Sequence, residues 1–230
     1  MRIISPYTLK WLHGGSEHND ISALIRENYH QVYHASLSRC MPWLLGMYDA
    51  NGELKAACGV QVASHGTLYL EQYLDTPIET TLSSRLELPV PREAIVEIGN
   101  FGARDGASAR IMYAALCLLL NQYHYGWIVF TGTKKIRNTF YRLNLHPIQL
   151  MSADPGRLGD AALEWGEYYQ HDPQIMAGEL TGGYTALSQN TMLLALFTPL
   201  PDAPWTDLSG GRCRFNLSMQ HPFQLSLSVF

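Results

Sequence analysis

The sequence predicts an α+β protein with a mixed sheet, and three observations favour this fold class. Residues 127–131, "WIVFT", form a continuous apolar run, which is typical of a strand covered on both faces. A strand-like segment at 94–101 and a helix-forming segment at 107–123 precede it, so the three predict a right-handed strand–helix–strand crossover. Residues 43–48 and 55–63 flank the turn signal "DANG" and indicate an antiparallel pair.

The remaining elements follow from periodicity. Residues 16–37 place apolar side chains at spacings of three and four behind the candidate cap Asp20, which predicts a helix. The stretch "LYLEQY" at 68–73 alternates as a strand does and would place Tyr69, Glu71 and Tyr73 on one face. Short helices over 80–86 and 134–143 and a strand over 146–151 complete the predicted core.

The chain changes character after residue 154, where Pro and Gly recur and periodicity weakens. We therefore expect a core over 1–154 and a C-terminal extension over 155–230 that packs on it within one integrated domain. Two roles for the extension remain open: completing a groove, or forming an oligomer contact such as that of a homodimer.

Composition excludes several functional classes. The chain has 230 residues, a net charge of −4 and 16 Lys and Arg, with no basic run longer than Lys134-Lys135, which argues against nucleic-acid binding. No apolar run approaches the ~18 residues of a membrane span, and the first residues lack the pattern of a signal peptide. The four cysteines have no paired spacing, so we expect reduced thiols in a cytoplasmic protein.

The junction between the segments at 94–101 and 107–123 has two open interpretations. In the first, backbone amides at the helix start and the helix dipole bind an anion, and flanking arginines hold phosphate oxygens of a pyrophosphate. The residues of this predicted phosphate site are Arg104, Gly106, Ala107, Ser108, Ala109 and Arg110. In the second, the junction is an ordinary helix start capped by Asp105 or Ser108, and a carboxylate at Asp105 would compete with a phosphate.

The order strand, phosphate-holding loop, helix, strand, helix resembles the core of the GNAT superfamily of acyltransferases. In that superfamily the loop wraps the pyrophosphate of acyl-CoA, and pantetheine lies where two strands splay apart. The loop over 104–109 departs from the usual Q/R-x-x-G-x-G/A pattern. It has one glycine, and Arg104 stands one place closer to Gly106 than the pattern requires.

Longer strings over most of residues 56–180 resemble the family named thermostable hemolysin. They are "LYLEQYLDTPIE", "EIGNFGA", "VFTGTKKIRNTFYRLNLHPIQLMSADPGRL" and "WGEYYQHDPQIMAG". That family is similar to acyl-homoserine-lactone synthases. The resemblance implies a GNAT-like acyltransferase fold with a C-terminal extension. It also implies transfer of a long-chain fatty acyl group from acyl-CoA or acyl-ACP to a small amine, an acyl-carrier protein as a possible partner, and no metal.

Candidate catalytic residues lie on the predicted strand at 94–101. Burial of Glu97 would raise its pKa toward the range of a general base for an amine; the alternative is a structural pair with an arginine such as Arg137. Asn100 is a second candidate on this strand. Glu71 is either a second carboxylate facing the same cleft or part of an exposed strand face.

A second cluster follows the apolar strand. Its candidate substrate-binding residues are Thr131, Thr133, Arg137 and Asn138, at the strand end where ligands of α/β folds usually sit. Thr133 has an alternative role as a helix cap. The GNAT resemblance makes Tyr141 the candidate proton donor to the departing thiolate, with Tyr168 or Tyr169 as alternatives.

Other chemistries find little support. His30 and His34 have metal-ligand spacing but no third ligand nearby, and neither an H-E-x-x-H nor a G-x-S-x-G motif is present. Two further functions stay open beside acyl transfer. One is a directly membrane-active haemolysin, for which residues 183–230 are the candidate segment. The other is a non-catalytic fold that binds an acyl-carrier protein.

Overall fold

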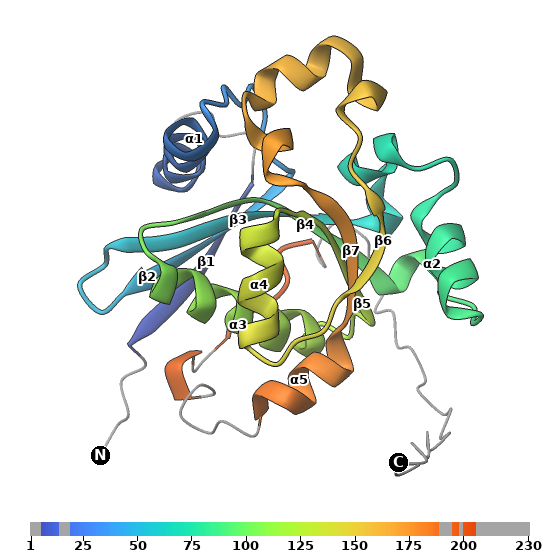
Figure 1. Ribbon diagram of the computed structural model, residues 1–230. Coiled ribbons are helices and arrows are strands. Elements are labelled where there is room, and N and C mark those ends of the chain that lie inside the picture. The colour runs from blue at the N-terminus through green and yellow to red at the C-terminus, as the bar shows by residue number, and fades with distance from the viewer. Residues whose placement is uncertain (1–5, 14–18, 189–194, 198–199, 206–230) are drawn as a thin grey trace, which may run out of the picture.

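The computed structural model describes residues 6–13, 19–188, 195–197 and 200–205, and its centre is a seven-stranded sheet (Figure 1). The strand order is β1-β2-β3-β4-β5-β7-β6; the β4–β5 pair is parallel and the other neighbours are antiparallel. The strands are β1 (Tyr7–His13), β2 (Trp43–Asp49), β3 (Leu54–Val62), β4 (Ile95–Ala103), β5 (Trp127–Gly132), β6 (Ile148–Ser152) and β7 (Gln174–Glu179). This mixed sheet confirms the predicted fold class.

Helices cover both faces of the sheet. The α-helices are α1 (Asp20–Tyr33), α2 (Ile78–Leu86), α3 (Gly106–Gln122), α4 (Lys134–Arg142) and α5 (Leu180–Ser188). Short 3₁₀ helices connect them: η1 (Ala63–His65), η2 (Tyr69–Tyr73), η3 (Arg92–Ala94), η4 (Pro155–Trp165), η5 (Tyr168–His171) and η6 (Ala195–Phe197). Figure 1 shows α1 and the η4–η5 segment on one side of the sheet, and α3 and α5 on the other.

The two layers are held by separate apolar cores, because successive strand residues point to opposite faces. Helix α3 is buried from Met112 to Leu120 against side chains such as Met47 and Val60, as expected of a crossover helix enclosed between the sheet and α5. On the opposite face, Leu24 and Ile25 of α1 pack on β2 and β3. A further cluster, formed by η2 and α2, covers β5 and β7 there.

Two local predictions differ from the structure. Residues 69–73 form the 3₁₀ helix η2 instead of a strand, because the Glu71 side chain accepts a hydrogen bond from the Leu68 amide and caps that turn. The predicted helix over 16–37 is shorter. Asn19, not Asp20, caps α1 by accepting from the Ser22 amide at 2.7 Å, and His34 ends the helix in the left-handed conformation.

Residues after 154 contribute to the sheet itself. Strand β7 lies between β5 and β6, so a division at residue 154 passes through the sheet. Segment 200–205 also reaches the core, because Trp205 is 4 % exposed and packs edge-on against Trp11 of β1. Most of the segment considered for direct membrane activity, 183–230, lies outside the described residues. In the described part of the chain, no helix combines the length and apolarity that a membrane span requires.

Strands β4 and β5 separate toward their carboxyl ends. They pair from Ile95–Trp127 to Ile98–Phe130, after which β4 pairs only with β3 and β5 continues beside β7. Asn100 takes the left-handed conformation here (φ 48°), beside an irregularity in the β3–β4 register. The separation places this part of β4 and the end of β5 at the border of a cavity.

Candidate active site

Glu97 of β4 is a buried carboxylate, 2 % exposed, held by backbone amides. Its Oε2 accepts from the Tyr69 amide at 2.7 Å and its Oε1 from the Leu70 amide at 3.0 Å, both at the start of η2. Burial raises the pKa of Glu97 to about 8; the two amides stabilise the ionised form but do not outweigh burial. Near neutral pH this carboxyl group can therefore both lose and accept a proton.

The cavity that contains Glu97 has a volume of about 530 Å³ and opens on the α1 face of the sheet. Its walls are rich in aromatic rings, which come from α1, η2 and the η4–η5 segment: Tyr29, Tyr69, Tyr73, Trp165 and Tyr168. We call this space the Glu97 cavity. Both Asn100 and Thr131 line it, so the structure brings together three of the residues predicted from the sequence.

Hydrogen bonds fix the aromatic walls. Trp165 donates its ring N–H to the Tyr69 hydroxyl at 2.9 Å, and the hydroxyls of Tyr73 and Tyr169 are 2.6 Å apart. Tyr168 donates to the Thr131 carbonyl at 3.1 Å, at the end of β5. Burial raises the pKa of Tyr168 well above its usual value, so the phenol keeps its proton.

Asn100 positions a neighbouring loop. Its Oδ1 accepts from the Met41 amide at 2.8 Å, and the Met41 side chain lies over Gly59 and Gly99. A Cβ at Gly99 would come within 2.5 Å of the Met41 Cε, so this position has no room for a larger residue unless the loop moves. The Asn100 amide therefore sets the shape of the cavity border next to Glu97.

Glu71 does not face the Glu97 cavity, which corrects the prediction of a second carboxylate in that cleft. It accepts from Arg92 through both oxygens, at 2.7 and 2.9 Å, and caps backbone amides at Leu68 and Ile78. Burial raises the pKa of Glu71, but the Arg92 hydrogen bond and the amides outweigh burial, so the net shift is downward. The residue is a structural anchor for η2, because its charge is already paired.

The alternative considered for Glu97, a structural pair with Arg137, is not formed in the described structure. Arg137 instead binds Asp172, at 2.6 Å to Oδ2 and 2.6 Å to the carbonyl, and also the Gly132 carbonyl at 2.8 Å. These contacts join the β5–α4 junction to the start of β7. Thr133 is buried beside the Tyr33 hydroxyl, at the start of α4.

Tyr141 and Asn138 are placed away from the Glu97 cavity. Tyr141 is 50 % exposed and contacts His146 through its ring at 5.8 Å, and Asn138 is exposed. Neither residue lines the Glu97 cavity, so the roles expected from the sequence, Tyr141 as proton donor to the thiolate and Asn138 as a substrate contact, stay predictions. Tyr168, the alternative weighed from the sequence, does line it.

The start of α3 carries its own carboxylate. Asp105 accepts from the amides of Ala107 and Ser108, each at 2.8 Å, and from the Ser108 hydroxyl at 2.9 Å. These hydrogen bonds lower the pKa of Asp105, and the Ser108 amide makes the largest contribution. The Asp105 carboxyl group is therefore ionised at neutral pH. Arg104 pairs with Glu27 at 2.8 Å. This arrangement corresponds to the second interpretation of the junction, a helix start capped by Asp105. The Asp105 cap occupies amides that a phosphate would use.

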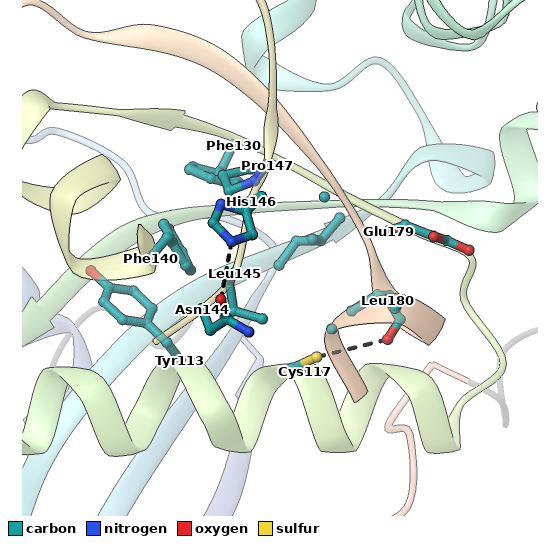
Figure 2. Close-up of a pocket in the computed structure, with 14 residues that line it drawn as sticks. Tyr113, Cys117, Phe130, Phe140, Asn144, Leu145, His146, Pro147, Glu179 and Leu180 are labelled. Carbon is teal, nitrogen blue, oxygen red and sulfur yellow. Dashed lines mark hydrogen bonds between the residues drawn. The ribbon is translucent and has the colours of Figure 1, made fainter. Parts of the chain in front are cut away.

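A second cavity, apolar and about 260 Å³ in volume, lies on the α3 face (Figure 2). Four aromatic rings cross from β4 to β5 beside it: Phe101 stacks on Tyr113 at 4.4 Å, Tyr113 meets Phe140 at 4.7 Å, and Phe140 meets Phe130 at 5.0 Å. Leu145 completes the wall above α3. We call this space the apolar cavity. No sequence motif marks this cavity, because its residues come from α3, β5, α4, β7, α5 and the loop between α4 and β6.

Among the described residues, no three His, Cys, Asp or Glu side chains are grouped so that they could hold a metal ion. His30 and His34, whose spacing suggested ligands, place their rings 6.5 Å apart at the end of α1.

Comparisons with known proteins agree with this architecture. The family described as thermostable hemolysin matches residues 13–184, whereas no curated protein matches the chain. The AHL synthase LasI superposes with a TM-score of 0.53 at 12% identity, covering 80% of this chain and 96% of that chain. TofI, in a ternary complex with an inhibitor and MTA, gives 0.53 at 16% identity and covers 81% and 99%.

FeeM, an N-acyl amino acid synthase from uncultured soil microbes, gives a TM-score of 0.50 at 13% identity and covers 79% of this chain and 98% of that chain. Identities this low show that the chain shares the fold of these synthases. The family match spans well over half of the sequence. The chain belongs to the thermostable hemolysin family.

Proposed function

We propose that the protein is an N-acyltransferase that moves a long-chain fatty acyl group from an acyl thioester, acyl-CoA or acyl-ACP, to a small amine. The observation that carries this proposal is Glu97: a buried carboxylate with a pKa of about 8, in a cavity bordered by the separating ends of β4 and β5. Burying a carboxyl group is costly, and no ion pair within the described residues offsets that cost at Glu97, which is held by two backbone amides alone.

Glu97 acts as the general base in this mechanism. The amine nitrogen attacks the thioester carbonyl, so that a C–N bond forms and the C–S bond breaks, and the proton lost by the amine passes to the Glu97 carboxylate directly or through water. Backbone amides of β4 beyond Ile98 are the candidate donors to the oxyanion. Tyr168 is the candidate proton donor to the thiolate, because it lines the same cavity.

The apolar cavity is the candidate site for the acyl chain. Its aromatic and aliphatic walls match a fatty chain, which gains free energy in proportion to the apolar area removed from water. It borders the aromatic rings that cross from Phe101 on β4 to Phe130 on β5, on the opposite side of the sheet from Glu97. A thioester held between the strand ends can therefore direct its chain to one face while the amine arrives from the other.

Two observations favour a carrier protein over CoA as the donor. Asp105 occupies the amides that would hold a pyrophosphate, and its negative charge opposes one. Helix α4 exposes Lys134, Lys135 and Arg142 and carries no acidic residue, although the whole chain has a net charge of −4; Arg137 on the same helix is paired with Asp172. A basic helix that borders the apolar cavity suits an acidic carrier protein, because electrostatic complementarity speeds association and selects partners.

The test is turnover by purified protein. Long-chain acyl-CoA and acyl-ACP are each supplied with an amine panel, and free thiol and product mass are followed. We expect thiol release coupled to N-acyl product, lost in Glu97→Gln and kept in the exposed control Glu93→Gln. Thiol release without acylated amine, or equal rates in Glu97→Gln and the intact protein, would contradict the proposal.

The same experiment addresses lysis of red cells. A long-chain N-acyl amine is amphiphilic and would lyse membranes without the protein inserting into them. We expect lysis to require the thioester and the amine. Lysis by the protein alone would favour a directly acting haemolysin, and donor binding that survives Glu97→Ala without any turnover in the intact protein would favour a non-catalytic carrier-binding fold.

A further inference from the structure

We propose that the acceptor amine carries a carboxylate, as an amino acid does, and that Arg39 binds this carboxylate at the mouth of the Glu97 cavity. The inference rests on the proposed acyl transfer and names its acceptor class.

Among the residues that the structure describes, three charged side chains line the Glu97 cavity: Glu97 at its buried end, and Glu164 and Arg39 in its exposed part. Arg39 is the single basic side chain among the described residues that line it. A positively charged side chain does not help an amine to bind near Glu97, because it would repel the ammonium form of that amine. A guanidinium in the same cavity therefore indicates that the ligand has a negative group as well.

Arg39 keeps its guanidinium free although an acidic residue is close along the rim. Within the described structure, Arg39 makes no ion pair and no hydrogen bond, whereas the Glu164 carboxylate accepts from the Ser38 hydroxyl at 2.8 Å. An ion pair with Glu164 at this exposed position would stabilise the fold little. Without that pair, all five N–H donors of the Arg39 guanidinium are available to a ligand at the cavity mouth.

The backbone on both sides of Arg39 is anchored, so the guanidinium is presented from a fixed position. Before it, the Ser36 amide donates to the Glu164 carbonyl at 2.7 Å. After it, the amide of Met41, two residues beyond Arg39, donates to Asn100 Oδ1 at 2.8 Å. Binding then costs mainly the rotamer freedom of one side chain instead of the ordering of a loop.

These features define how an amino acid would lie. Its amino group points inward to Glu97, which takes the proton released on acylation, and its carboxylate lies outward on Arg39, where two parallel N–H···O contacts are possible. The side chain then meets the aromatic walls formed by Tyr69 and Trp165, which favour apolar or aromatic acceptors. A carboxylate near Glu97 without Arg39 would be repelled.

The experiment compares matched acceptors that differ only in the carboxylate: phenylalanine with phenethylamine, and leucine with isoamylamine. kcat/KM is measured for the intact protein, for Arg39→Gln and for Arg85→Gln, an exposed arginine of α2 outside the Glu97 cavity. We expect the intact protein to prefer each amino acid at least tenfold. Arg39→Gln should raise KM for the amino acids about 10- to 100-fold, as expected for a lost charge-assisted contact, and leave both simple amines unchanged.

The outcomes separate the two proposals. Acylation of amines without preference for a carboxylate, or an equal loss on both acceptors in Arg39→Gln, would overturn the role of Arg39 and leave acyl transfer standing. Faster acylation of phosphoethanolamine than of any amino acid would replace the carboxylate by a phosphate. Failure of the intact protein to acylate any acceptor from either donor would overturn the proposed function, and this inference with it.

Discussion

The two cavities beside β5 differ in chemistry although adjacent residues of that strand line them, Phe130 the apolar cavity and Thr131 the Glu97 cavity. On the α1 face, Glu97 lies among phenol and amide groups, with Arg39 and Glu164 nearer the opening. On the α3 face, Ile128 and Phe130 lie among mainly apolar side chains, and Asn144, His146 and Glu179 are the polar residues of that lining. The alternation of side chains along a strand produces this difference, because one residue step moves a side chain to the other face. The comparison teaches that proton transfer and chain binding can be tested independently.

Removing the carboxylate from the polar side should have the largest effect. Glu97→Gln keeps the side-chain size but cannot accept a proton, so we expect kcat to fall about 10²- to 10⁴-fold, the usual contribution of a general base. Circular dichroism and thermal melting check the fold, and Glu93→Gln on η3 is the matched control. A loss of less than fivefold in a folded variant would remove Glu97 from the chemistry.

The pH dependence sharpens this test. With a pKa of about 8, Glu97 is mostly protonated at pH 6, so the rate should rise about tenfold per pH unit up to that pKa and level above it. Stability should run the other way. A carboxyl group whose pKa is raised on folding binds more protons in the folded state, so the free energy of unfolding falls as pH rises from about 4.5 to about 8. Urea titrations of Glu97→Gln should lose that part of the slope; an unchanged slope would contradict it.

Filling the apolar cavity should change the preference for acyl-chain length without affecting Glu97. Leu145→Trp places a larger ring in the apolar cavity, and we expect about 10- to 100-fold lower kcat/KM for long-chain donors with little change for short-chain ones. Leu88→Trp is the control, since Leu88 is exposed outside this cavity. If both chain lengths lose activity equally, the chain does not lie there.

Reversing charge on α4 should have a smaller effect, limited to a carrier-protein donor. Lys134→Glu with Lys135→Glu makes the exposed start of α4 acidic, which slows association with an acidic partner, and we expect about tenfold lower kcat/KM for acyl-ACP at low salt. The rate with acyl-CoA at saturation should stay unchanged. Parallel losses with both donors would mean that the lysines act on the fold instead of on docking.

The smallest expected effect concerns the start of α3. Asp105→Ala removes a cap that satisfies two amides, so the free energy of unfolding should fall by about 1 kcal/mol, measured by urea denaturation. Asp105→Asn retains most of the cap and removes the charge. If the junction can bind a pyrophosphate, this variant should use acyl-CoA better than the intact protein does; unchanged use of CoA supports a donor held elsewhere.

Sequence periodicity was sufficient for the central elements and failed where contacts outweigh local preference. The boundaries of β4, α3, β5 and α4 differ from the predicted ones by a few residues, since apolar runs and helix-forming segments act over short distances. The strand predicted over 68–73 was wrong. Its residues alternate as in a strand, but the contacts of Glu71 with Arg92 and with backbone amides impose a capped turn. The candidate base Glu97 was recognisable because an acidic residue within an apolar strand is unusual.

By itself, the sequence determined the crossover around α3, the buried carboxylate on β4 and the family, since each depends on residues near one another along the chain. Only the tertiary structure decided which side chains share a cavity. It set Arg39, Trp165 and Tyr168 around Glu97, and it assigned Glu71 and Arg137 to other partners. The physical reason is that a charged group takes whichever partner the fold brings within a few ångströms, and that choice depends on contacts between residues distant in sequence.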